Sequence, residues 1–190
     1  MLASVLVGLN CFKVILLAGR VCAFEQEFGF RIKKDNVVSE GIEIALKTEK
    51  RDQEAYAGMA AKAKNPRLKE LFARLASDET LHVRELEELR ECLKASGRWT
   101  EMKAKRLALP ESPAVNAAKA FEATDDEVEA LVAAMKGENA AEQFYRKMAV
   151  HAPKNGRKFF EKLAEMEARH YEVLDALFQE FEDAAVKLTR

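Results

Sequence analysis

Four stretches of the sequence repeat apolar residues at three- and four-residue steps, which is the spacing of one face of an α-helix. They follow Ser39, Pro66, Thr124 and Gly156. Long helices also suit the composition, because the chain has only 8 Gly and 4 Pro among its 190 residues. The sequence therefore predicts an all-α fold in which four helices bury their apolar stripes against one another.

The connections between these stretches predict the order of the helices. Asn65-Pro66 is typical of a helix start, with Asn as the cap and Pro at the first helical position. The periodicity loosens over residues 97–123, which indicates a long connection, and Thr124–Glu127 then reads as a capping box. Pro153 and Asn155-Gly156 predict a second short turn. Two antiparallel hairpins follow, in a four-helix bundle with a long crossover between helices 2 and 3.

The apolar stripes carry acidic residues and histidines at positions where packing calls for Leu or Ile. A buried carboxylate without a partner costs several kcal/mol, and four of them would use up the roughly 5–15 kcal/mol of net stability available to a domain, so something positive must lie among them. Four carboxylates and two neutral imidazoles carry a charge of −4, which two divalent cations cancel. The predicted metal ligands are Glu49, Glu79, His82, Glu138, Glu167 and His170.

The candidate ligands repeat in the two halves of the chain. Glu49 is followed seven residues later by Tyr56 and thirty later by an E-x-x-H motif, and Glu138 is followed seven later by Tyr145 and twenty-nine later by another. Three residues of helix put the Glu and the His of each motif on one face, so a bridging Glu and a terminal His can reach neighbouring metals. Such matching spacing suggests duplication of one helical hairpin. Each hairpin supplies one Glu and one E-x-x-H motif, the general arrangement of ferritin-like di-metal proteins.

The chemistry of the predicted donor set favours two iron ions, with manganese as the alternative. Oxygen-rich sets with two imidazoles suit these metals, whereas structural zinc prefers Cys or His and closes with four ligands.

These motifs resemble the rubrerythrin branch of the ferritin-like superfamily over roughly residues 38–185. The resemblance is carried by E-K-R-D-Q-E-A-Y ending at Tyr56, S-D-E-T-L-H ending at His82, G-E-N-A-A-E-Q-F-Y ending at Tyr145, and E-M-E-A-R-H ending at His170. It implies that Tyr56 and Tyr145 donate hydrogen bonds to metal-ligating carboxylates, although both could be ordinary core aromatics. It also implies a homodimer or a larger homo-oligomer.

Two departures from the family pattern bear on the reaction. Rubrerythrins that end in a rubredoxin domain carry two cysteine pairs there, and this sequence has none, so a separate electron donor protein such as a rubredoxin is expected. Members of that kind also have a further ligand Glu where this sequence has Ala141, which puts their redox-dependent ligand exchange in doubt. Glu142 is a candidate substitute, but a surface position is favoured.

The leading hypothesis for function is a non-haem di-iron oxidoreductase of rubrerythrin type, which reduces peroxide or oxidises ferrous iron in the response to oxidative stress. H₂O₂ or O₂ is the expected oxidant. Two alternatives stay open. One is an iron-binding, storage or delivery protein without turnover, and the other is a di-iron oxygenase acting on an organic substrate. A purely structural bundle is the least favoured interpretation.

Charge and cysteine content narrow the partners and the compartment. The formal net charge is −1, with basic and acidic residues mixed along the chain, so no nucleic-acid partner is expected. Cys11, Cys22 and Cys92 are far apart in sequence and are predicted to be free thiols in a reducing compartment, so the expected location is the cytoplasm.

The N-terminal segment, residues 1–35, is set apart from the predicted di-metal domain of residues 36–190. Residues 1–24 include 18 apolar residues, but Lys13 and Arg20 interrupt them, so a membrane-spanning helix is not favoured. Three interpretations compete: an uncleaved packing or membrane-contacting helix, a poor secretory signal, and added sequence from an upstream start codon.

Overall fold

The computed structural model describes residues 34–102 and 123–188, and these residues form four α-helices with no strand among them. The all-α prediction is confirmed. The chain divides into two compact units, residues 1–40 and residues 41–190, and the second holds the candidate centre. The predictions for residues 1–33, including Cys11 and Cys22, lie outside the described residues. The helices are α2 (Lys34–Lys62), α3 (Pro66–Ser96), α4 (Asp125–His151) and α5 (Lys154–Leu188).

The ends of α3 are set by the residues that the sequence indicated. The Asn65 side chain accepts hydrogen bonds from the backbone N–H groups of Arg67, at 2.9 Å, and Leu68, at 3.2 Å. Such a cap is worth about 1 kcal/mol because it satisfies donors that have no partner within the helix. Gly97 ends the helix with φ of 65°, a left-handed conformation that glycine adopts at little cost.

The predicted capping box at the start of α4 is confirmed, and its glutamate has a second role. The Thr124 side chain accepts from the backbone N–H of Glu127, whose carboxylate accepts from the N–H of Thr124. The same carboxylate also accepts from the N–H groups of Lys64 and Asn65, each at 2.7 Å. Glu127 therefore ties the α2–α3 turn to the first turn of α4. The sequence showed only the local part of this arrangement.

The predicted turn at Asn155-Gly156 is wrong, because α5 already begins at Lys154. The break is confined to Ala152 and Pro153, and the N–H of Arg157 donates to the Pro153 carbonyl at 2.9 Å. Gly156 serves a close approach instead of a turn. A Cβ atom at residue 156 would lie 2.4 Å from ring atoms of Trp99, so only glycine lets the indole pack against this part of the helix.

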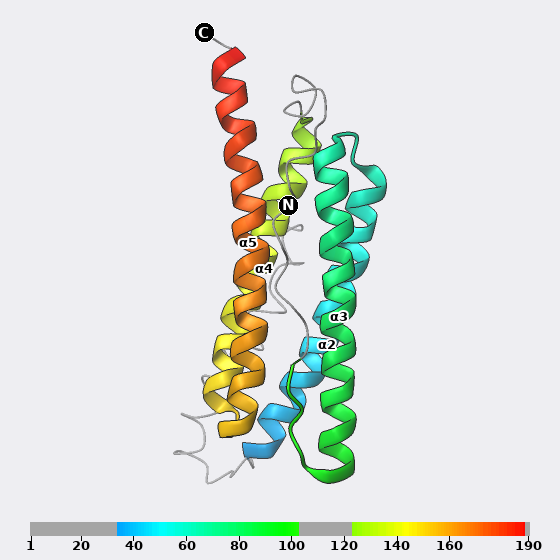
Figure 1. Cartoon of the computed structure of the whole chain (residues 1–190), viewed down its shortest axis with the longest axis vertical. Helices are drawn as coiled ribbons and strands as arrows, with labels where there is room; N and C mark the ends of the chain where they lie inside the picture. The colour runs from blue at the N-terminus through cyan, green and yellow to red at the C-terminus, as the bar shows by residue number, and fades with distance from the viewer. Residues whose placement is uncertain (1–33, 103–122, 189–190) are drawn as a thin grey trace, which may run out of the picture. The chain divides into compact units, whose positions relative to one another are not determined.

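Contacts between α2 and α3 show that they form an antiparallel hairpin. Gln53 donates to Thr80 at 2.7 Å, and Lys50 pairs with Glu87 at 2.7 Å. Residues later in α2 therefore contact residues earlier in α3. In Figure 1 the blue-to-cyan ribbon of α2 lies alongside the green ribbon of α3, and the yellow ribbon of α4 lies alongside the orange and red ribbon of α5. Two hairpins were predicted, and two are observed.

Helices α2 and α4 also run antiparallel. Tyr56 donates a hydrogen bond to Glu138, and Tyr145 donates one to Glu49, so residues later in α2 again contact residues earlier in α4. Since α2 is antiparallel to both α3 and α4, the last two are parallel to each other. The end of α3 at Ser96 and the start of α4 at Asp125 therefore lie at opposite ends of the bundle, as expected for two hairpins joined by a crossover.

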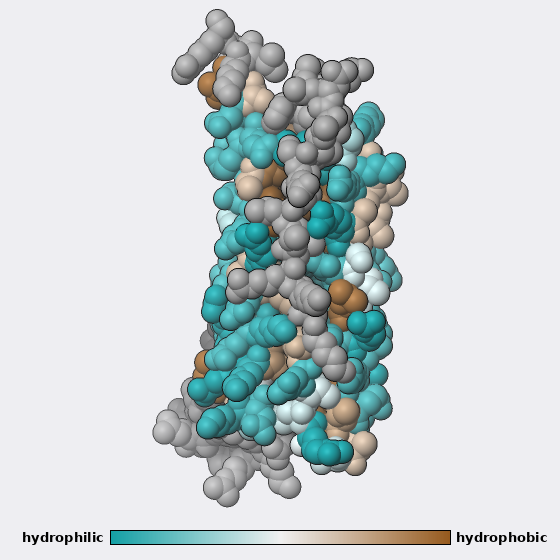
Figure 2. Space-filling view, in the orientation of Figure 1, coloured by the Kyte–Doolittle hydropathy of each residue, from teal (hydrophilic) through white to brown (hydrophobic). Residues whose placement is uncertain are grey.

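The core of residues 41–190 is built from the apolar stripes of all four helices. One cluster includes Tyr56, Leu68, Phe72, Leu75, Leu131, Leu174 and Phe181, all of which are buried. On the face shown in Figure 2 the residues of known placement are mostly hydrophilic. None of the four helices in the described parts of the chain is both long and apolar enough to cross a membrane.

Candidate metal centre

All six predicted ligand side chains point into the middle of the bundle. α2 supplies one glutamate, α3 one E-x-x-H motif, α4 one glutamate and α5 the second E-x-x-H motif. Each side chain comes from an apolar stripe, so the packing that buries the stripe also buries its polar member. Every one of these residues is at most 3% exposed: Glu49, Glu79, His82, Glu138, Glu167 and His170.

His82 and three glutamates around its imidazole form one group of four potential ligands. Its Nδ1 atom lies 2.9 Å from Glu79 Oε2, 3.1 Å from Glu167 Oε1 and 3.2 Å from Glu49 Oε2. One donor atom from each of these four residues lies within 4.8 Å of the others, which is close enough for all to bind one cation.

A second group surrounds His170 in the same way. Its Nδ1 atom lies 3.2 Å from Glu79 Oε1 and 3.5 Å from both Glu138 Oε1 and Glu167 Oε2. Glu79 and Glu167 belong to both groups, and each of them places one oxygen beside His82 and the other beside His170. That is the geometry of two carboxylates that bridge neighbouring cations. The two imidazoles stack with their ring centroids 5.4 Å apart.

The two tyrosines contact the carboxylates that are not shared. Tyr56 donates its hydroxyl to Glu138, and Tyr145 donates its hydroxyl to Glu49, so each bond joins α2 to α4. Each phenol ring also stacks on a phenylalanine: Tyr56 on Phe72 at 6.1 Å, and Tyr145 on Phe160 at 6.3 Å. The internal repeat of the sequence is therefore a repeat in space that extends beyond the ligands.

Burial and mutual repulsion set the protonation of the cluster when no cation is bound. Desolvation raises the pKa of Glu49 and Glu138 well above the usual value, and repulsion from the shared carboxylates Glu79 and Glu167 adds to it. Burial would lower the pKa of His82 and His170, but the surrounding carboxylates raise it well above the usual value.

The shared carboxylates shift in the opposite direction. Burial would raise the pKa of Glu79 and Glu167, but the protonated imidazoles lower it below the usual value. The unshared carboxyl groups and the imidazoles therefore keep their protons to higher pH than usual, whereas the shared carboxyl groups lose theirs at lower pH.

The donor set fits a pair of divalent cations. Glu167 Oε1 and His170 Nδ1 are buried without a hydrogen-bond partner, which is costly unless something else engages them. Both belong to the side chains that could hold a cation. Carboxylate oxygens with imidazole nitrogens suit iron and manganese.

A small pocket of about 90 Å³ opens onto the carboxylate side of the cluster. Glu49, Asp52 and Tyr56 line it from α2, and Ala133, Gly137 and Ala141 are among the small residues that line it from α4. The small α4 side chains leave the gap between the two helices. The sequence had not singled out Asp52 as a residue of the site.

One further residue of the site was not singled out in the sequence. Asp78 Oδ2 lies 3.5 Å from His170 Nε2, the nitrogen that faces away from the carboxylates. The signal for it was present in S-D-E-T-L-H, since Asp78 directly precedes the first bridging glutamate.

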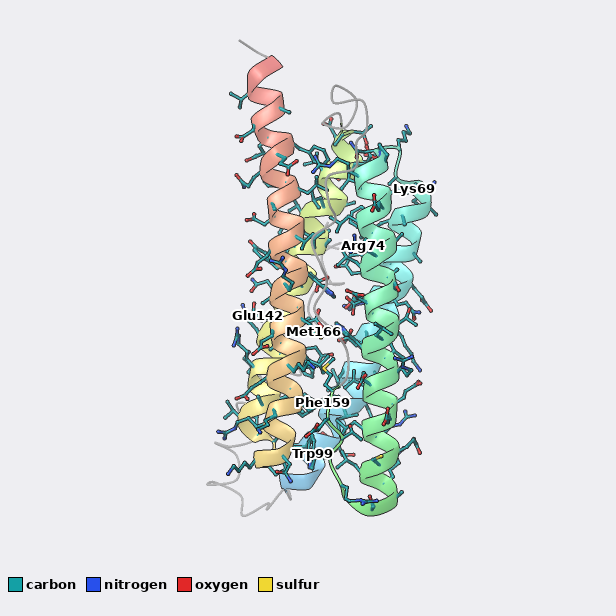
Figure 3. The ribbon with its side chains drawn as sticks, in the orientation of Figure 1. Lys69, Arg74, Trp99, Glu142, Phe159 and Met166 are labelled. Atoms are coloured by element: carbon teal, nitrogen blue, oxygen red, sulfur yellow. The ribbon has the colours of Figure 1, made fainter. Side chains whose placement is uncertain are left out.

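Two other candidates lie outside the cluster. Glu142 pairs with Arg146 at 2.6 Å and lies on the outer side of α4 (Figure 3), as the favoured surface interpretation predicted. Cys92 is a free, partly buried thiol on α3.

Comparison with known proteins agrees with this geometry. The family model described as rubrerythrin matches residues 40–127 and 129–189, a span that includes all six buried ligand candidates. Searches of curated proteins and of solved structures found no match. Because the family model covers most of its length, the chain belongs to the rubrerythrin family.

Proposed function

We propose that this protein is a di-iron oxidoreductase that reduces a small oxidant, with H₂O₂ as the favoured substrate. The observation that carries the proposal is the placement of Glu79 and Glu167, each with one oxygen beside His82 and the other beside His170. These two carboxylates are shared by both groups of potential ligands, so they could hold two adjacent cations together with one further glutamate and one imidazole for each. Two bound iron ions would supply the two electrons that cleavage of an O–O bond requires.

The protein contributes orientation and exclusion of water. The Tyr56 and Tyr145 hydroxyls fix the carboxylates of Glu138 and Glu49, so these ligands keep their direction toward the cation positions. The two histidines are fully buried, and they do not line the pocket. A substrate that enters the pocket therefore meets the carboxylate side of the centre.

The size of the pocket favours a small oxidant over an organic substrate. A volume of about 90 Å³ is far below that of a typical pocket for an organic ligand. H₂O₂ and O₂ fit within it, whereas a drug-sized molecule needs several hundred Å³. This argues against the oxygenase alternative.

Asp52 is placed to supply protons. Reduction of H₂O₂ to two water molecules consumes two electrons and two protons. Asp52 lines the pocket, and burial raises the pKa of its carboxyl, although Arg51 opposes the shift. We assign to this carboxylate the transfer of protons from solvent to the substrate in the pocket. The glutamates that line the pocket also suit entry of Fe²⁺, so ferrous iron is the second candidate substrate.

Rapid mixing tests the proposal. The protein is loaded with two Fe²⁺ per chain without oxygen and mixed with H₂O₂ or O₂, while absorbance follows iron oxidation. We expect fast oxidation with one H₂O₂ consumed per two Fe²⁺, and repeated turnover when a reduced rubredoxin is added. Glu142→Gln is the control, since Glu142 lies outside the centre. Loaded protein that is oxidised by neither compound would contradict the proposal. Iron that enters and leaves without peroxide turnover would favour storage or delivery.

A further inference from the structure

The two halves of the centre correspond residue by residue. A residue on α3 and the residue 88 positions later on α5 take equivalent places, as Glu79 and Glu167 do, and also His82 and His170. The same offset relates Phe72 to the phenylalanine that stacks on the other tyrosine. Any difference between paired positions therefore marks a difference between the two cation positions.

The correspondence fails at the residue that precedes each bridging glutamate. On α3 this residue is Asp78, and its counterpart on α5 is Met166, which is buried (Figure 3). Asp78 Oδ2 lies 3.5 Å from His170 Nε2, and each of these two buried atoms has no other hydrogen-bond partner, so a small adjustment would bring them into a hydrogen bond. His82 Nε2 is likewise buried without a hydrogen-bond partner, but no carboxylate of the described residues pairs with it, since the ion pairs of His82 are all made by Nδ1. One imidazole thus has an acidic acceptor behind it, and the other has none.

This difference acts on the histidines as ligands. In both groups Nδ1 faces the carboxylates, so a neutral imidazole that binds a cation through Nδ1 must carry its hydrogen on Nε2. A carboxylate that accepts this hydrogen fixes the tautomer and the ring orientation, and it makes the ligand nitrogen more basic. Asp78 can do this for His170. The Nε2–H of His82 is left buried without an acceptor, which opposes the form that binds a cation.

We propose that Asp78 makes the two cation positions unequal, so that the one at His170 fills first and binds more tightly than the one at His82. Asp78 is a positioning residue in this proposal, because it acts through His170 and does not touch the cation. The inference rests on the proposed di-metal function. It adds an order of loading and names the residue that sets it.

The charge of Asp52 does not reverse this order. Asp52 lies on α2, three residues from Glu49, and its carboxylate accepts hydrogen bonds from the Arg51 guanidinium at 2.9 Å and 3.0 Å. Its negative charge is therefore largely compensated, and Asp52 is not among the carboxylates that pair with either imidazole. Asp52→Asn provides a matched control for the loss of a nearby charge.

Titration of the metal-free full-length protein with Co²⁺, followed by calorimetry and by the visible absorbance of the bound ion, tests the proposal. We expect two steps of one ion each, with dissociation constants at least about tenfold apart. Asp78→Asn should weaken the first step by about 10- to 100-fold and leave the second nearly unchanged. Asp52→Asn should preserve the separation. His170→Ala should abolish the tighter step, and His82→Ala the weaker one.

A second readout addresses the tautomer directly. In Zn²⁺-loaded protein labelled with ¹⁵N on histidine, the Nε2–H of His170 should exchange slowly with solvent in the wild type and faster in Asp78→Asn. Circular dichroism establishes that each variant is folded. A single undivided step in the wild type, or equal weakening of both steps by Asp78→Asn, would overturn the inference. Failure to bind any ion would instead overturn the di-metal function itself.

Discussion

The hydroxyl of Tyr145 donates a hydrogen bond to the carboxylate of Glu49, which joins α4 to α2 inside the bundle. Both residues are buried, so removal of the donor leaves a carboxyl group poorly satisfied. We expect Tyr145→Phe to lower the free energy of unfolding by about 1–2 kcal/mol. The thermal midpoint should fall by about 2–4 °C for each kcal/mol. Tyr171→Phe, a change on the partly exposed part of α5, is the control and should leave the midpoint in place.

Cation binding should depend steeply on pH. With no cation bound, the pKa values of Glu49, Glu138, His82 and His170 are all raised, so these four groups hold protons that a cation must displace. A raised pKa means that affinity is weakest at low pH and grows as pH rises toward and through the raised values. We expect up to four protons to be released when two ions bind. Calorimetry in buffers of different ionisation enthalpy counts them, and binding without proton release would contradict the assignment.

A larger side chain in the pocket should slow the oxidation of bound iron by H₂O₂ without lowering the iron content. Ala141 lines the pocket, whereas its neighbour Ala140 is exposed on α4. We expect Ala141→Leu to reduce the rate of iron oxidation by H₂O₂ by at least about tenfold, because an isobutyl group occupies much of the space beside the carboxylates. Iron content should stay at the wild-type level. Ala140→Leu is the matched control, and equal rates in both variants would show that the oxidant takes another route.

Gly156 and Gly58 should respond oppositely to alanine. Both lie in helices, where alanine is favoured over glycine by about 1 kcal/mol. A Cβ atom at Gly58 meets nothing within 4 Å, but at Gly156 it lies 2.4 Å from the Trp99 ring. We expect Gly58→Ala to stabilise the fold and Gly156→Ala to destabilise it by about 1 kcal/mol after overpacking is included. Trp99 is the sole tryptophan, so its fluorescence should shift only in Gly156→Ala.

The buried ligand candidates could be predicted because they violate a local rule. A glutamate such as Glu79 or Glu138, on a stripe that otherwise carries leucine, must face the core wherever its helix packs, so periodicity alone placed it. The helix ends at Asn65 and Gly97 were predictable for a similar reason, because caps depend on neighbouring residues only.

Features that depend on the register between helices could not be derived in this way. The approach of Asp78 to His170 requires α3 and α5 to align to within one helical turn. The bonds from Lys64 to Glu127 likewise join segments that are distant in sequence. At Gly156 the local turn signal was overruled by packing against Trp99. A comparison of the two halves at a fixed offset would have exposed the difference at Asp78, although not its geometry.

Neither hairpin holds a complete set of ligands for even one cation, because each group of four draws on both. Two copies of one ancestral hairpin, associated about a two-fold axis, would already have supplied a glutamate and an E-x-x-H motif each. In such a symmetric pair both histidines would have faced the same neighbour. Only after the copies were joined in one polypeptide could one keep an aspartate, as at Asp78, while the other held a methionine, as at Met166. A single polypeptide can thus give its two candidate cation positions different neighbours, which a symmetric pair of identical hairpins cannot do.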